Sequence, residues 1–338
     1  MTSPLPLLRV PYLPLARIID FMEPNELVSL SFCSQKSQSV IKTLRKASCD
    51  EHLHVGGSEN NVSSISFTNF GCVLSTSNSA YISSSKKEEF VKLGEQQVRV
   101  KYHRLRKYLM TYWEDELTGL EAITDYVMDL FNIDVSEVYI SKDSFKMIEW
   151  VNNRQKTQLK KVAYVDWNRI PSEEEMNYIL KDCQCSSEIL IYSEAPPNFR
   201  FSSNFRRIDC FDITDSKWVT IDNLLTMDGV DIVLGTCSLS STDLNVFLKH
   251  WLSGGCPRLK FFLAMINTVN ILQLLDGLMD NAVVVENDRN YSSPFGYSKT
   301  LSFGVDIQRA DGVTATVCKQ MNETLVIAVW PEITYNYI

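Results

Sequence analysis

The sequence predicts an α/β protein with short N-terminal helices, a β-rich connector, and strands that alternate with helices and end in an antiparallel β meander. Three observations predict this fold. Near the N-terminus, apolar residues fall at helical spacing between prolines. Further along, a strand-like pattern recurs at a nearly constant interval, with helical patterns between its copies. Near the C-terminus, an Asp-Gly pair between two alternating runs is the strongest short-range signal for a β-hairpin.

The N-terminal stretch predicts an extended arm followed by three short helices. Its prolines fix φ and lack an N–H, so residues 5–13 are expected to be extended and no helix is expected before Pro14. Apolar residues then follow helical spacing. Pro24 is expected at the first position of the second helix, and Ser34 is expected to cap the third.

The N-terminal helices carry more apolar residues than they can bury. Leu8, Val10, Leu13 and Phe32 are left over from the predicted helix faces. A unit of about 40 residues is near the lower limit for independent folding, and burying apolar area elsewhere contributes about 25 cal/mol per Å². The surplus therefore predicts a protein interface, and the alternative is an ordinary helical cap on the following domain.

The pattern of this stretch resembles an F-box. A Val-Pro pair stands where the family usually has Leu-Pro, an Ile-Ile pair matches its first helix, and a proline opens its second helix. The sequence departs from the family at Ser37, near the position where many F-boxes have a tryptophan. The resemblance implies docking on the Skp adaptor of a cullin-based (SCF-type) ubiquitin ligase, through Leu8, Val10, Pro11, Leu13, Ile18, Ile19, Pro24, Leu27 and Leu30.

The sequence is most similar to the large nematode group of F-box proteins with a type 2 F-box-associated domain. The similarity begins at residues 6–13 and returns in residues 242–251, 306–316 and 329–331. It implies an adaptor that recruits a protein substrate for ubiquitin-dependent degradation. The expected parts are an F-box at 1–47, a β-rich connecting region at 48–118, and an F-box-associated substrate-binding domain at 119–338.

From about residue 119 to 290 the chain repeats a pattern of apolar, two residues, apolar, one residue, apolar. Its central positions lie 19 to 27 residues apart, close to the period of leucine-rich repeats. We therefore predict an irregular leucine-rich-repeat-like βα solenoid, closed by an antiparallel β cap at 300–331; an α/β domain with a parallel sheet is the alternative. The central residues are Val138, Val162, Ile189, Ile208, Ile232, Leu259 and Ala282.

Residues between the apolar positions of each strand are expected to share one outward surface. Aromatic residues occur there more often than solvation requires, and aromatic residues anchor interfaces. The alternative is that helices or the flanking β region cover this surface. The predicted substrate-binding residues are Tyr139, Tyr192, Phe211, Asp231 and Lys260.

The composition narrows the possible partners. The 338 residues are 45% hydrophobic and carry a net charge of −8, which argues against a nucleic-acid partner because phosphate binding relies on clustered Lys and Arg. The odd number of scattered cysteines is typical of reduced thiols, so we expect a cytoplasmic or nuclear protein. No apolar run approaches the length that spans a membrane, and no membrane association is expected.

No motif predicts enzyme chemistry. Cys49, His52 and His54 lack the further ligands of a zinc site, and the one-residue spacing of Cys183 and Cys185 fits neither a zinc nor a redox pattern. We therefore expect no catalytic residue, metal or cofactor. Two alternatives stay open: a leucine-rich-repeat-like interaction scaffold that is not assembled into a ligase, and a hydrolase with an unfamiliar site.

Overall fold

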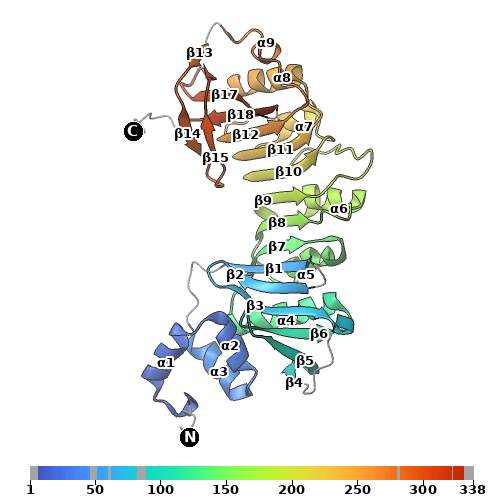
Figure 1. The fold of residues 1–338 in the computed structure, drawn as a ribbon, viewed down its shortest axis with the longest axis vertical. Helices are drawn as coiled ribbons and strands as arrows, with labels where there is room; N and C mark the ends of the chain where they lie inside the picture. The colour runs from blue at the N-terminus through green and yellow to red at the C-terminus, as the bar shows by residue number, and fades with distance from the viewer. Residues whose placement is uncertain are drawn as a thin grey trace. The chain divides into compact units, whose positions relative to one another are not determined.

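The computed structural model describes residues 7–45, 52–59, 62–81, 89–279, 282–321 and 323–330. It shows a mixed α/β fold with helices at the N-terminus and extensive β-sheet (Figure 1). The chain divides into two compact units, Met1–Leu159 and Lys160–Ile338. Each unit is described by itself.

The first of the N-terminal helices begins earlier than expected. Helix α1 starts at Tyr12, and Leu7–Arg9 forms a 3-10 turn in place of an extended arm, so both predictions for this segment are wrong. Pro14 lies in the first turn of α1, where backbone N–H groups have no partner within the helix, so a proline is tolerated there. The elements are η1 (Leu7–Arg9), α1 (Tyr12–Phe21), α2 (Pro24–Ser31) and α3 (Gln35–Leu44).

The starts of α2 and α3 follow the predicted capping. Pro24 opens α2, and the Glu23 backbone N–H donates to a carboxylate oxygen of Glu26 at 3.1 Å. The Ser34 hydroxyl accepts a hydrogen bond from the Ser37 backbone N–H, also at 3.1 Å. Both predicted helix starts are therefore confirmed.

The sheet of the first unit has the strand order β7-β1-β2-β3-β6-β5-β4. Strand β1 pairs with β7, and β3 with β6, in parallel; the other pairs are antiparallel. The elements are β1 (Leu53–Glu59), β2 (Val62–Phe67), β3 (Gly71–Asn78), η2 (Ser79–Tyr81), β4 (Glu89–Leu93), β5 (Gln96–His103), β6 (Tyr108–Trp113), α4 (Glu116–Phe131), β7 (Val135–Ile140), η3 (Lys142–Ser144) and α5 (Lys146–Arg154). Although the third predicted part begins at residue 119, α4, β7 and α5 lie in this unit.

Helices α2 and α3 pack against the body of the first unit. The ring of Phe32 stacks on Tyr126 of α4, with centroids 4.7 Å apart and planes 10° from parallel. The Tyr126 hydroxyl lies 2.7 Å from the Ser31 hydroxyl, and the Asn25 side chain donates to the Lys107 carbonyl at 2.7 Å. Phe32 is therefore not left over for a partner, because α4 already covers it.

The sheet of the second unit has the order β8-β9-β10-β11-β12-β18-β17-β16-β13. Strands β9 to β12 run parallel, and β18 continues the sheet antiparallel to β12. The elements are β8 (Leu159–Val165), α6 (Glu173–Asn177), the π-turn η4 (Tyr178–Asp182), β9 (Cys185–Tyr192), β10 (Cys210–Ser216), α7 (Ile221–Thr226), β11 (Asp231–Cys237), α8 (Ser241–Leu252), β12 (Phe261–Met265), α9 (Ile271–Leu274), β13 (Ala282–Val285), β14 (Arg289–Ser292), β15 (Ser298–Leu301), β16 (Gly304–Gln308), β17 (Thr314–Gln320) and β18 (Thr324–Val329).

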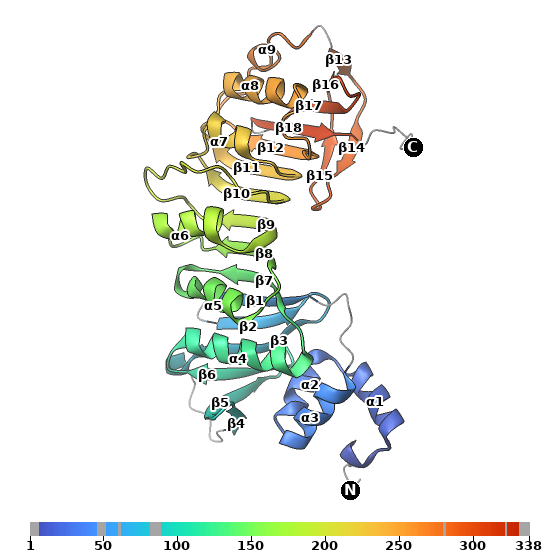
Figure 2. The same cartoon turned by 180° about the vertical axis from the view of Figure 1, so that it is seen from behind.

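One face of this sheet is covered by helices α6, α7 and α8 (Figure 2). Cross-strand registry places Ile189, Phe211 and Ile232 side by side, and all three side chains are fully buried. Each helix connects two neighbouring parallel strands. The predicted alternation of strand and helix is therefore found between β8 and β9 and between β10 and β12, whereas the segment that joins β9 to β10, all of which the structure describes, contains no helix.

The last predicted repeat is wrong. Strand β13, which contains Ala282, pairs antiparallel with β16 at the edge of the sheet. Strands β16, β17 and β18 form the predicted meander, and Gly312 in its first turn has a φ of 89°, a conformation that favours glycine.

The opposite face of the sheet is partly covered by the β14–β15 hairpin, which the sequence did not predict. Tyr291 and Leu301 of this hairpin are buried against β11, β12, β17 and β18. The apolar cluster between hairpin and sheet consists of Val233, Phe261, Leu263, Tyr291, Leu301, Cys318, Val326 and Ala328.

Candidate partner and substrate interfaces

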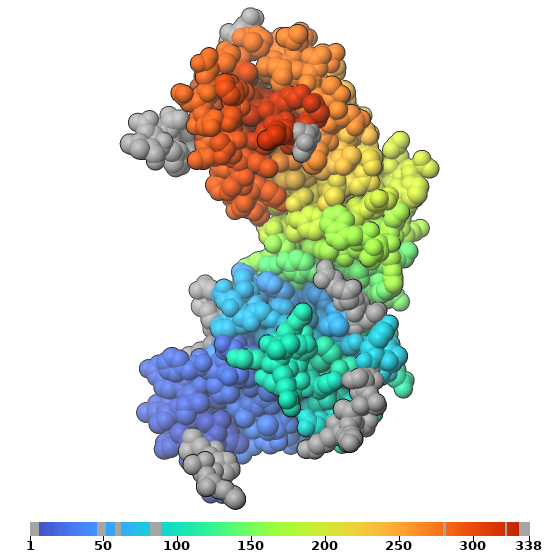
Figure 3. Space-filling model, in the orientation of Figure 1, coloured from blue at the N-terminus to red at the C-terminus, as the bar shows by residue number. Residues whose placement is uncertain are grey.

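Helix α1 exposes large apolar side chains. Tyr12, Leu13 and Phe21 are 65%, 74% and 86% exposed. A hollow of about 600 Å³ lies beside Tyr12 and Leu13, with further walls from Arg17 and Leu44. The N-terminal helices form the blue surface of the first unit in Figure 3. An apolar surface of this kind next to a hollow is typical of protein interfaces.

The structure divides the predicted Skp-binding residues into three groups. Pro11 and Leu13 are exposed, whereas Ile19, Pro24 and Leu27 are buried and cannot contact a partner without a rearrangement. The buried residues hold the helices in place and so shape the surface indirectly. The half-buried residues are Leu8, Val10, Ile18 and Leu30.

Sequence reasoning missed two exposed residues of α1. The expected extended arm includes Tyr12, because the predicted helix begins later than α1 does. Phe21 lies three residues after Ile18, a spacing that places both on one side of a helix. That spacing was a usable signal for Phe21.

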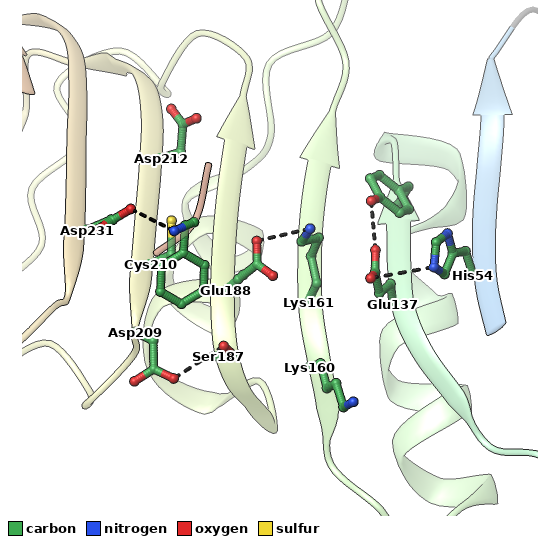
Figure 4. Close-up of polar contacts among 12 residues, drawn as sticks. His54, Glu137, Lys160, Lys161, Ser187, Glu188, Asp209, Cys210, Asp212 and Asp231 are labelled. Carbon is green, nitrogen blue, oxygen red and sulfur yellow. Dashed lines mark hydrogen bonds and ion pairs between the residues drawn. The ribbon is translucent and has the colours of Figure 1, made fainter. Parts of the chain in front are cut away.

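In the second unit, the face opposite the helices carries polar side chains at its β8–β10 end. The ammonium of Lys161 on β8 lies 3.0 Å from the carboxylate of Glu188 on β9 (Figure 4). Cross-strand registry places Glu188 beside Cys210, and Leu190 beside Asp212. These side chains therefore share one surface.

An aromatic pair lies at the end of β9. The ring of Trp167 is parallel to that of Tyr192 within 3°, with centroids 6.3 Å apart, and Trp167 is 67% exposed. The Tyr192 hydroxyl donates to the Asp212 carboxylate at 2.9 Å, and Tyr297 donates to the same oxygen at 2.6 Å. Burial, together with the charge of Asp212, raises the pKa of Tyr192, so this hydroxyl stays protonated.

The prediction that Phe211 faces outward is wrong. Its side chain is fully buried on the helix-covered side, and its ring packs edge-on against Phe205 at 5.4 Å. Cys210 and Asp212 point to the other side, because side chains alternate along a strand.

Asp231 faces the predicted side but is covered there. Its carboxylate accepts hydrogen bonds from the Ser293 hydroxyl and, at 3.2 Å, from the Phe295 N–H. Burial raises the pKa of this carboxyl, and the two hydrogen bonds oppose the rise. The alternative that a flanking β region covers part of the surface is therefore correct at this position.

The remaining predicted substrate residues lie apart from the buried ones. Lys260, just before β12, is half-buried and lines a pocket beside the hairpin. Tyr139 belongs to β7 in the first unit, where its hydroxyl donates to Glu137 at 2.8 Å. Glu137 also lies 3.5 Å from the His54 ring (Figure 4).

Six cysteines of the second unit are buried: Cys183, Cys185, Cys210, Cys237, Cys256 and Cys318. Burial raises the pKa of the Cys183 thiol to about 12, so it is not a nucleophile at neutral pH. In the described ranges, no group of three or more His, Cys, Asp and Glu side chains could hold a metal ion. Cys49 lies outside the described residues. Within the same ranges, no helix is long and apolar enough to cross a bilayer.

Comparison with known protein families identifies two regions of the chain. The model of the F-box domain matches residues 7–48, which include α1, α2 and α3. The model described as F-box associated, which is of type 2, matches residues 197–263. This range includes β10, α7, β11 and α8. No curated protein and no solved structure matched the chain.

Proposed function

We propose that this chain, which carries an F-box domain and a type 2 F-box-associated domain, is the substrate-recognition adaptor of a cullin-based ubiquitin ligase. The F-box docks on a Skp-type adaptor, and the C-terminal region holds a protein substrate. The observation that carries the proposal is the exposed apolar surface of α1, which lies within the matched F-box.

The mechanism we propose is proximity. An adaptor that binds a substrate at one end and a ligase at the other raises the effective concentration of the two reactants. The chemistry then belongs to the partner subunits, and this chain contributes no catalytic group. Such a protein acts in the cytoplasm or the nucleus.

We assign the docking surface to the exposed and half-buried residues of the F-box. Leu8, Val10, Pro11, Leu13, Ile18 and Leu30 contact the Skp adaptor, together with Tyr12 and Phe21, while Ile19, Pro24 and Leu27 support them from inside. Burial of each large apolar side chain contributes about 1.5–3 kcal/mol.

We propose that the substrate binds the sheet face of the second unit that lies opposite helices α6, α7 and α8, which we call the outer face. The consecutive order of β8 to β12 supports treating this region as an irregular leucine-rich-repeat-like stack closed by the C-terminal meander. Lys161, Tyr192 and Trp167 lie on its open part. The division into an F-box at 1–47, a connector at 48–118 and a substrate-binding domain from 119 is part of this proposal.

Co-purification with the Skp adaptor tests the docking surface. Leu13→Asp and Phe21→Lys place charges on the exposed side of α1, and each charge suits its end of the helix dipole, so folding is retained. We expect either change to weaken binding by at least about tenfold, which corresponds to 1.4 kcal/mol.

Leu105→Asp is the matched control, because Leu105 is 92% exposed in the same unit but lies outside α1. Circular dichroism checks that all variants fold. If the natural chain folds and does not bind the Skp adaptor, the ligase proposal fails. The interaction scaffold not assembled into a ligase then becomes the better account.

A further inference from the structure

Trp167 is an exposed tryptophan that lies just after β8 in the second unit. It is 67% exposed, and of the aromatic rings in the described part of the chain it contacts only that of Tyr192. The two ring planes are parallel within 3°. Tryptophan and tyrosine are enriched among the side chains that anchor protein interfaces. Trp167 is therefore available as an aromatic surface for a partner.

Tyr192 connects this aromatic pair to a carboxylate on the neighbouring strand β10. Tyr192 and Tyr297 both donate to Oδ2 of Asp212, at 2.9 and 2.6 Å. The other oxygen, Oδ1, accepts no hydrogen bond from the residues that the structure describes, and it is not fully enclosed. Although Asp212 is only 9% exposed, an incoming donor can therefore reach this oxygen.

No cation of the described ranges balances the charge of Asp212. Two nearby acidic side chains differ in this respect. Glu188 on β9 lies 3.0 Å from the ammonium of Lys161 (Figure 4), and Asp215 at the end of β10 lies 3.2 Å from that of Lys217. The hydrogen bonds to Asp212 come from neutral hydroxyl groups, and no ion pair includes this residue. One negative charge on the outer face is therefore uncompensated.

An exposed aromatic ring beside an uncompensated carboxylate suits a cationic ligand. A carboxylate that has lost most of its hydration is unfavourable unless an opposite charge approaches. A cation is also attracted to the face of an indole ring. Trp167 and Asp212 both contact Tyr192, so one long cationic side chain can contact both.

A guanidinium group fits these contacts better than an ammonium group. It is planar, so it stacks on an aromatic ring, and its N–H groups form charge-assisted hydrogen bonds to carboxylates in a fixed geometry. The net charge of −8 also favours a cationic partner, because opposite charges steer two proteins together.

We propose that Trp167, Tyr192 and Asp212 form a binding site for an arginine side chain carried by another protein. The guanidinium stacks on the ring of Trp167 and donates to Oδ1 of Asp212. The proposal rests on the proposed function only in taking that protein to be the ligase substrate. It then names the substrate class, which is a protein with an arginine in an accessible segment.

Titration of the isotope-labelled full chain with short peptides, followed by nuclear magnetic resonance, tests the site. The probe is the capped pentapeptide Ala-Ala-X-Ala-Ala, in which X is arginine, lysine or citrulline, the neutral analogue of arginine. The indole N–H signal of Trp167 is identified among those of the six tryptophans by its loss in Trp167→Phe. We expect the arginine peptide to shift this signal, and the citrulline peptide to bind at least about tenfold more weakly, equivalent to 1.4 kcal/mol.

Asp212→Asn tests the charge. The asparagine oxygen still accepts from the tyrosine hydroxyls, so folding is retained, and circular dichroism checks this. We expect the variant to bind the arginine peptide about tenfold more weakly, and added salt to weaken binding to the natural chain. Asp222→Asn is the matched control, because Asp222 is an exposed aspartate of α7, on the helix-covered side of the sheet.

The proposal is overturned if the arginine and citrulline peptides bind equally or if the Trp167 signal does not move. It is also overturned if a folded Asp212→Asn variant binds no more weakly than the Asp222→Asn control. A lysine peptide that binds as tightly as the arginine peptide overturns the assignment to arginine. The comparison of peptides uses the natural chain, so it tests the site even if Asp212→Asn does not fold.

The titration needs no Skp adaptor, so the two proposals fail separately. Arginine binding in a chain that does not bind Skp retains this site and removes the ligase role. Skp binding without arginine binding removes this site and retains the ligase role.

Discussion

The two surfaces that we assign to partners differ in whether their side chains already interact with other residues of the chain. On α1, Leu13 and Phe21 are exposed apolar side chains. On the outer face of the second unit, Lys161 pairs with Glu188, and Tyr192 bonds to Asp212. The first surface suits a partner that buries apolar area. The second is polar, and its partners must replace or add to existing hydrogen bonds, which favours selectivity over affinity.

The largest expected effect on stability concerns the helix-covered face of the sheet in the second unit. Phe211→Ala removes a fully buried ring, and we expect the free energy of unfolding to fall by about 3–5 kcal/mol, because the change leaves a cavity. Urea denaturation measures the change. A loss below about 1 kcal/mol would show that Phe211 is not a core residue.

An intermediate effect is expected on the polar outer face. Tyr297→Phe removes the hydroxyl that donates to Asp212 at 2.6 Å. We expect the free energy of unfolding to fall by about 1.5 kcal/mol, as is typical of a hydrogen bond to a charged group. The same denaturation experiment applies. Tyr291→Phe removes a hydrogen bond to a neutral carbonyl, so it should lower the free energy of unfolding by less than Tyr297→Phe does. A larger decrease for Tyr291→Phe would contradict the role given to the Asp212 charge.

The smallest effect on stability is expected on α1. Leu13→Ser changes a side chain that is 74% exposed, so the free energy of unfolding should change by no more than about 0.5 kcal/mol. Thermal unfolding followed by circular dichroism tests this expectation. A decrease in the free energy of unfolding of more than about 2 kcal/mol would mean that Leu13 packs against other residues of the chain and is not available to a partner.

Local patterns were sufficient to predict most of the helices and their starts. Helical spacing identified α5, α7 and α8, and the capping residues Pro24 and Ser34 fixed the starts of α2 and α3. These features depend on residues close in sequence, so a sequence pattern contains them. The start of α1 was missed, because a proline in the first turn of a helix was treated as a barrier.

The orientation of the β10 side chains and the formation of the β14–β15 hairpin depend on contacts between residues that are distant in sequence. Strand β10 has buried residues on both of its faces, so alternation alone could not decide whether Phe211 or Cys210 points to the helices. The hairpin strands have four residues each and are held by bonds such as that from Tyr291 to the Lys260 carbonyl. The site was therefore predicted only in part: Lys260 lines a pocket, but its partners from the hairpin were missed.

Hydrogen exchange of the backbone amides, with and without the Skp adaptor, tests the docking surface most directly. We predict slower exchange in Tyr12–Phe21 on binding, because the exposed side of α1 becomes buried, and unchanged exchange in β14 and β15. Unchanged exchange throughout α1 in a chain that binds the adaptor would contradict the account.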